Sequence, residues 1–101
     1  MEDTSPKNVD FDQMIREHFD QLTKSEKRIA NYIRKNQEES AFLAAGEIAD
    51  RLGLSEATMV RFARTIGFSS YPAMREVLQD NFRRRVTHSA RLRSRLDDLR
   101  E

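Results

Sequence analysis

Residues 45–68 read AGEIADRLGLSEATMVRFARTIGF, and this stretch decides the fold. It predicts a short helix over residues 46–52, a tight turn at Gly53-Leu54 and a second helix over residues 56–66. Gly53 suits the turn because glycine adopts the left-handed conformation that ends a helix without a Cβ clash. Gly67 is expected to end the second helix in the same way. Two short helices joined by a tight turn are therefore expected here.

This pair of helices has the features of a helix-turn-helix unit. Such a unit needs a small residue where the helices cross, a glycine in the turn and apolar residues that lock the pair. Ala49 is the small residue, Gly53 is the turn glycine, and Ser55 is a good N-cap for the second helix. The locking positions hold apolar side chains, namely Ile48, Leu52, Leu54, Met59 and Phe62. A plain helical bundle is the alternative, because any amphipathic helical hairpin meets some of these requirements.

The two faces of the helix over residues 56–66 differ in chemistry. At about 100° per residue, one side collects the apolar residues and is expected to be buried: Met59, Phe62, Ala63 and Ile66. The opposite side carries no acid and presents Ala57, Val60, Arg61, Arg64 and Thr65. Its arginines suit guanine edges or phosphates, and its small and apolar groups suit close approach to thymine methyls. Ser55 and Thr58, at the helix start, suit phosphate or base contacts. We therefore expect this face to bind DNA.

The apolar pattern before this unit predicts two further helices. The first begins after the N-cap Asp10, with Gln13 as its capping-box-like partner, and its apolar face holds Phe11, Met14, Ile15, Phe19 and Leu22. Thr23 and Glu26 form a capping box for the second, whose buried stripe holds Ile29, Ala30 and Ile33. Asn36 is expected to end it, and Ser40 to cap a short turn.

A last core helix is predicted after the unit. Pro72 suits its first position, and its core-facing residues are Met74, Val77, Leu78 and Phe82. The prediction is therefore an all-α, five-helix helix-turn-helix bundle with a polar N-terminal tail and an Arg-rich C-terminal helical extension.

The charged residues are unevenly distributed, although the net charge is only +1 from 18 basic and 17 acidic residues. Fourteen of the cations are arginine, whose planar guanidinium suits phosphates and guanine edges. Residues 83–95 hold six arginines and no acid. We expect Arg84 and its neighbours Arg83 and Arg85 to have no partner acids and to meet phosphates if they meet DNA. A solvated helix face is the alternative.

Three segments are expected along the chain: a disordered tail at residues 1–8, the DNA-binding domain at residues 9–82 and a basic helical extension at residues 83–101. The extension carries leucines at spacings typical of a coiled-coil seam, namely Leu92, Leu96 and Leu99. These leucines and the apolar face of residues 11–22 are the candidate contacts of a homodimer. The extension stops without a helix cap, which is typical of a fragment of a longer protein.

The composition excludes several function classes. The chain has no cysteine, which excludes disulfides, thiol catalysis and cysteine-ligated metals. His18 and His88 lie far apart without suitably spaced ligands, so neither a metal nor a cofactor is expected. The chain shows no nucleophile–base pair and no glycine-rich phosphate loop, and an enzyme is not expected. The longest apolar run, residues 41–45, is too short for a membrane span or a signal peptide, so we expect a cytoplasmic protein.

Several stretches resemble one known family. LTKSEKRIA (residues 22–30) with Ile33, EIA (residues 47–49), LSEATMVRF (residues 54–62) and IGF (residues 66–68) resemble the N-terminal domain of the RpiR/MurR family of bacterial transcriptional regulators. The resemblance covers residues 10–82. It implies a five-helix DNA-binding domain that acts as a dimer on palindromic operators and controls genes of sugar or amino-sugar metabolism. It also implies a C-terminal domain that senses a phosphorylated sugar.

The chain departs from the family pattern in two places. Ala44 stands where the family has a Ser or Thr cap, so the helix that follows is expected to fray by roughly 1 kcal/mol. The sugar-sensing domain is absent, so no sugar response is expected of these residues.

We therefore predict a sequence-specific DNA-binding domain of a transcriptional regulator, with double-stranded operator DNA and a second copy of the chain as partners. The alternative is a helical interaction or dimerisation module without DNA binding. Such a module would expose large apolar anchors, which Ala57, Arg61 and Arg64 are not.

Overall fold

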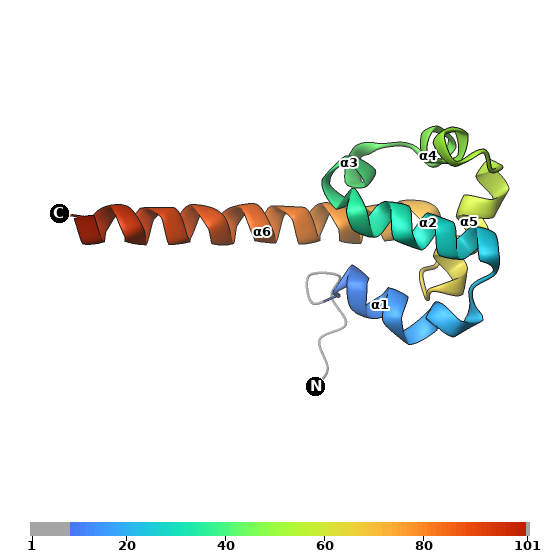
Figure 1. Ribbon diagram of the computed structural model, residues 1–101, viewed down its shortest axis with the longest axis horizontal. Coiled ribbons are helices and arrows are strands. Elements are labelled where there is room, and N and C mark those ends of the chain that lie inside the picture. Colours follow the sequence, from blue (N-terminus) through green and yellow to red (C-terminus); the bar gives the residue numbers. More distant parts are fainter. Residues whose placement is uncertain (1–8, 101) are drawn as a thin grey trace.

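The computed structural model describes residues 9–100, with side chains up to Leu96. It contains α1 (Phe11–His18), the 3-10 turn η2 (Phe19–Gln21), α2 (Lys24–Lys35), α3 (Gln37–Phe42), α4 (Ala45–Leu52), α5 (Glu56–Thr65) and α6 (Tyr71–Arg100). The first five helices and the start of α6 form a bundle, and the rest of α6 extends away from it (Figure 1). The described residues include no strand, so the all-α prediction is confirmed. The tail predicted at residues 1–8 lies outside them.

One core holds the bundle together. Its largest completely buried apolar side chains are Phe11, Ile15, Ile29, Ile33, Ile48, Met59, Phe62, Ile66, Met74 and Leu78. They include residues from every predicted core-facing stripe. Burying such a side chain contributes about 1.5–3 kcal/mol relative to leaving it exposed. The short helices are therefore stabilised mainly by packing, since helices of this length are marginal alone.

The prediction of five helices is wrong, because residues 37–42 form a sixth helix where a turn capped by Ser40 was expected. Ser40 lies inside α3, is completely buried, and donates its N–H to the Asn36 carbonyl at 2.8 Å. α3 packs along α6, where Gln79 Nε2 donates to the Ala41 carbonyl at 2.9 Å. The contact with α6 explains why so short a segment is helical.

The starts of α1 and α2 follow the predicted caps, whereas α6 begins at Tyr71, one residue before the Pro72 that was predicted at its first position. The capping box of α2 is confirmed: Glu26 Oε1 accepts the Thr23 N–H at 2.9 Å, and Thr23 Oγ1 accepts the Glu26 N–H at 3.1 Å. Asp10 caps α1, since its Oδ1 accepts the Asp12 N–H at 3.1 Å. Gln13 forms no capping box, because its Nε2 donates instead to Glu17 Oε2 at 3.0 Å, one turn further along.

α6 is one continuous helix of 30 residues, so the predicted core helix and basic extension are two parts of a single element. Residues 83–96 are exposed. The expectation that Arg84 has no partner acid is wrong. Its Nε donates to Asp80 Oδ2 at 3.0 Å, and the two side chains form an ion pair. The i,i+4 spacing explains this, because it places the acid and the cation on one face of a helix.

Candidate nucleic-acid interface

α4, the turn at Gly53 and α5 form the helix-turn-helix unit that the sequence predicts. Gly53 has a φ of 70°, in the left-handed region. The Leu54 N–H then donates to the Ala49 carbonyl at 2.8 Å, which closes the end of α4. Ile48 and Ala49 are buried, and Leu52 and Leu54 are half-buried against the core. The turn and this packing together set the direction of α5.

α4 is held at both ends although Ala44 has no side chain that can cap it. Glu47 Oε1 accepts the Ala44 N–H at 3.1 Å, which supplies half of a capping box. At the other end, Arg28 of α2 donates from Nη2 to the Leu52 carbonyl at 2.8 Å. Sequence reasoning missed both contacts. A Glu three residues after the cap position signals the first, whereas nothing in the local pattern joins Arg28 to Leu52.

The ends of α5 carry the predicted caps. Ser55 Oγ accepts the Thr58 N–H at 3.2 Å, and Thr58 Oγ1 lies 2.9 Å from Ser55 Oγ. Gly67 follows the helix with a φ of 109°, and a Cβ there would lie 2.8 Å from Met14 Cε. The positive φ favours glycine at this position, whereas the Met14 methyl lies at the end of a flexible side chain that could shift to admit a Cβ.

The two faces of α5 are divided as predicted. Met59, Phe62, Ala63 and Ile66 are completely buried. The candidate DNA-binding residues lie on the other side: Ser55, Ala57, Arg61 and Arg64 are exposed, and Thr58, Val60 and Thr65 are half-buried at its edges.

Neither arginine of this face forms an ion pair with a carboxylate among the described side chains. Arg61 Nη2 donates to Thr58 Oγ1 at 3.2 Å, one turn earlier on the helix. The ion pairs among the described side chains involve Arg34, Arg51 and Arg84, and none involves Arg61 or Arg64. Both guanidinium groups therefore present positive charge and unused N–H donors to the solvent.

Thr65 lies at the edge of the α5 face that adjoins α2. Its Oγ1 donates to the Arg61 carbonyl at 2.9 Å and lies 3.4 Å from Glu26 Oε2. Glu26 is only 6% exposed, and its other carboxylate oxygen caps α2. Sequence reasoning assigned Glu26 to that cap alone. The structure shows that Glu26 also joins the first turn of α2 to the last turn of α5.

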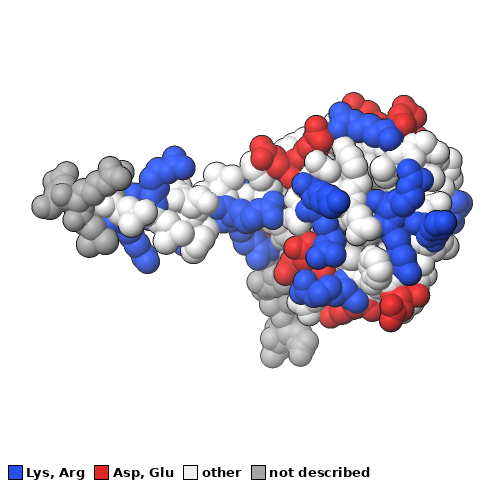
Figure 2. Space-filling model, in the orientation of Figure 1, with Lys and Arg blue, Asp and Glu red and all other residues white. Residues whose placement is uncertain are grey.

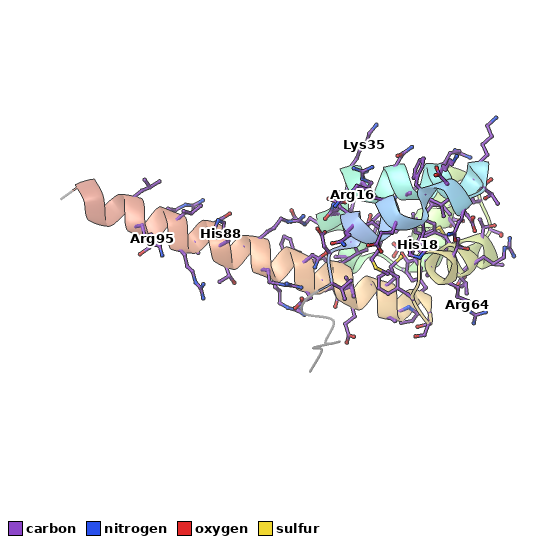
Figure 3. All side chains as sticks on the ribbon, turned by 90° about the horizontal axis from the view of Figure 1, so that it is seen from below. Arg16, His18, Lys35, Arg64, His88 and Arg95 are labelled. Carbon is purple, nitrogen blue, oxygen red and sulfur yellow. The ribbon has the colours of Figure 1, made fainter. Side chains whose placement is uncertain are left out.

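Arg84 is the one candidate that lies apart from the other seven. It sits on α6, where the helix leads away from α5 (Figure 1). Arg64 projects from the bundle, whereas His88 and Arg95 lie along the extended part of α6 (Figure 3). Next to Arg84, Arg85 Nη1 donates to Gln37 Oε1 at 2.7 Å. The basic residues at the start of the extension are therefore tied to the bundle at its end away from α5.

Two kinds of feature are not found among the described residues. They contain no group of three His, Cys, Asp or Glu side chains that could hold a metal ion. No helix among residues 9–100 is long and apolar enough to cross a bilayer. A cavity of about 310 Å³ lies between α1, α3 and α6, and its walls carry both acids and arginines, including Asp10, Asp12, Arg84 and Arg85.

Regulators from several bacteria are similar to this chain. An uncharacterized HTH-type transcriptional regulator of Haemophilus influenzae is 45% identical over 53 residues, which are 52% of this chain and 18% of that protein. HexR of Pseudomonas aeruginosa, an HTH-type transcriptional regulator, is 30% identical over 63 residues, 62% of this chain and 22% of its own. RpiR of Escherichia coli, also an HTH-type transcriptional regulator, is 29% identical over 77 residues, 76% of this chain and 26% of its own.

These relatives are named as transcriptional regulators rather than enzymes, and the chain spans about a quarter of their length or less. No solved structure is significantly similar to it. The family model described as "Helix-turn-helix domain, rpiR family" matches residues 9–85. Because this match covers well over half of the chain, the chain belongs to the rpiR family of helix-turn-helix domains.

Proposed function

We propose that this chain is the sequence-specific DNA-binding domain of a transcriptional regulator and that the exposed face of α5 reads the operator. The observation that carries the proposal is the composition of this face: two arginines without carboxylate partners among small and hydroxyl side chains. A helix of this kind fits the major groove, which is about 12 Å wide. Arg61 is centred on the face and is assigned to base edges.

The other residues of the face have supporting roles. Ser55 and Thr58, at the start of α5, are assigned to phosphate or base contacts together with the backbone N–H groups there. Ala57 and Val60 allow close approach and meet thymine methyls, Arg64 contacts a guanine edge or a phosphate, and Thr65 lies at the margin of the face. Arg84 is assigned to a phosphate, to which it is attracted less strongly because Asp80 already opposes its charge.

Binding of the chain to DNA fragments at two salt concentrations separates this proposal from the alternative interaction module. Contacts to phosphates release counterions, so the affinity for DNA must fall steeply as salt rises. Selection from a random duplex library then yields an enriched sequence if α5 reads bases. Salt-independent binding, or selection that enriches no sequence, would favour the interaction module.

We also propose that the domain acts as a dimer on two symmetric half-sites. One recognition helix reads only a few base pairs, and paired half-sites supply the missing specificity. The apolar face of residues 11–22 does not support the contact, because Phe11, Ile15 and Leu22 are buried in the core. Exposed apolar residues of α6 do support it, namely Val86, Leu92 and Leu96. The side chain of Leu99 lies outside the described part.

The regulated genes are proposed to belong to sugar or amino-sugar metabolism, as the resemblance to the RpiR/MurR family implies. A phosphorylated sugar would act only through a further C-terminal domain, and the regulator would work in the cytoplasm. We expect a panel of sugar phosphates to change the operator affinity of this chain by less than tenfold. The cavity beside Asp10 and Asp12 also carries Arg84 and Arg85, so its lining offers no excess of positive charge to a phosphate. A tenfold change or more would contradict it.

A further inference from the structure

The outward side of α2 carries a concentration of positive charge that the DNA-reading face of α5 does not include. All five cations of α2 lie there: Lys24, Lys27, Arg28, Arg34 and Lys35. The one acid of the helix, Glu26, is buried on the opposite side against Thr65. Lysine and arginine side chains accordingly gather on the bundle face where α2 lies, with acids mainly toward its margins (Figure 2).

The two ends of this row of cations differ. At the C-terminal end, Arg34 lies 3.6 Å from Asp12, and α3 follows with Glu38 and Glu39. At the N-terminal end, no described acid forms an ion pair with Lys24, Lys27 or Arg28. These three residues are called the α2 cluster below.

The α2 cluster lies beside the helix-turn-helix unit. Arg28 Nη2 donates to the Leu52 carbonyl, at the turn between α4 and α5. Glu26 contacts Thr65 in the last turn of α5. The N-terminal end of α2 therefore lies next to α5, whereas its C-terminal end lies toward α3 (Figure 1). Lys35 and Arg64 accordingly project from different sides of the bundle (Figure 3).

Lys27 has a further contact that limits its movement. Its Nζ lies 5.0 Å from the centre of the Phe19 ring, within the range of a cation–π interaction. Lys24 and Arg28, on either side of it, are exposed. The cluster thus combines Lys27, held against η2, and Arg28, which keeps N–H donors besides the one bound to the Leu52 carbonyl, with the exposed ammonium group of Lys24.

We propose that the α2 cluster binds phosphates of the same duplex that α5 reads, on the strand that borders the major groove nearest Thr65. This inference rests on the proposed function and adds a second contact region to it. A helix in the major groove brings neighbouring elements to the backbone on either side. Lysine ammonium groups are compact point charges that suit phosphates without reading sequence. The cluster therefore adds affinity and fixes orientation, while α5 supplies specificity.

The test compares Lys24→Gln with Lys35→Gln, which remove the same charge from opposite ends of the same helix. The affinity of each full-length variant for a short mixed-sequence duplex is measured across a series of salt concentrations. Loss of one phosphate contact lowers the slope of log affinity against log salt by about 0.9. We expect Lys24→Gln to lower the slope by this amount and Lys35→Gln to leave it unchanged. The selected operator should weaken with Lys24→Gln by the same factor as the mixed-sequence duplex.

Two results would overturn the proposal. If Lys24→Gln left the slope unchanged, the cluster would not touch DNA. If both variants lowered it equally, the row of cations would act only through general charge. Arg28→Lys keeps the positive charge but lacks the guanidinium that donates to the Leu52 carbonyl. The salt slope should therefore stay at the parent value even if the turn between α4 and α5 is loosened. Arg61→Ala tests the proposed function separately from this inference. If Arg61→Ala abolishes the preference for the operator while Lys24→Gln has no effect, only this inference fails.

Discussion

Asn81 of α6 binds the backbone of Phe11 at the start of α1, seventy residues earlier in the chain: Asn81 Oδ1 accepts the Phe11 N–H at 3.1 Å. Its Nδ2 donates to the Val9 carbonyl at 2.9 Å, so one amide satisfies two backbone groups. We expect Asn81→Ala to lower the free energy of unfolding by about 1–3 kcal/mol, because both groups lose their partner in a partly buried place. Thermal and urea unfolding followed by circular dichroism measure this.

Asn31→Ala is the matched control, since Asn31 is exposed on α2. It should leave stability within about 0.5 kcal/mol of the parent. Equal stability of the two variants would show that the Asn81 contacts do not hold α1 to α6.

Tyr71, at the start of α6, predicts how stability depends on alkaline pH. Burial raises the pKa of its hydroxyl to about 12, and the nearby positive charge of Arg75 opposes the shift only in part. In the unfolded chain the pKa is about 10. The neutral hydroxyl therefore contributes stability that is fully present below pH 10 and is lost as pH rises toward 12.

Tyr71→Phe should remove much of this alkaline loss. At neutral pH it should cost little, because the buried Tyr71 hydroxyl has no hydrogen-bond partner among the described residues. Unfolding of the variant and the parent at pH 7 and at pH 11 measures both effects. If Tyr71→Phe and the parent lost stability equally between these pH values, the assignment to Tyr71 would be wrong.

Arg84 is expected to contribute less to DNA binding than a cation that is not paired with a carboxylate. Its charge is already opposed by Asp80, and it lies on the part of α6 that leads away from α5. Arg84→Ala should weaken operator and mixed-sequence DNA equally and lower the salt slope by less than the roughly one unit of a full phosphate contact. Salt titration of both affinities checks this. A full unit would mean that Arg84 leaves Asp80 to bind DNA.

The exposed leucines of α6 predict how the dimer depends on the extension. Replacing Leu92 and Leu96 with serine should reduce binding to a duplex with two half-sites while leaving binding to one half-site unchanged. The control replaces Thr87 and Ser94 with alanine, because these exposed residues lie on the other side of the helix. Footprinting and competition between the two duplexes measure the effect. Equal loss on both duplexes, or protection of a single half-site by the parent chain, would contradict the dimer proposal.

Local signals in the sequence were sufficient for most of the fold and for the faces of α5. The Gly53 turn, the Ser55 cap and the apolar residues Met59 and Phe62 act within a few positions of one another, and the structure confirms them. α3 was missed because its helical state depends on packing against α6 rather than on its own pattern.

Contacts between distant positions were not foreseeable in the same way. Arg28 reaches Leu52, and Asn81 reaches Val9 and Phe11, only because the folded bundle brings them together. The pairing of Arg84 with Asp80 differs, because its i,i+4 spacing within a helix is a local signal in the sequence. The candidate site was therefore predictable on α5, where periodicity decides exposure, and least predictable where a neighbouring helix contributes.

The most direct test of the account is the effect of Arg61→Ala on specific and non-specific affinity, with Arg16→Ala, an exposed position on α1, as the control. The operator is the sequence selected from a random duplex library, and both duplexes are measured at several salt concentrations. The account predicts a loss of about 1–3 kcal/mol on the operator, a far smaller loss on mixed-sequence DNA and an unchanged unfolding temperature. Arg16→Ala should change neither affinity appreciably. If Arg61→Ala weakened both duplexes equally, the exposed face of α5 would not be the surface that reads DNA.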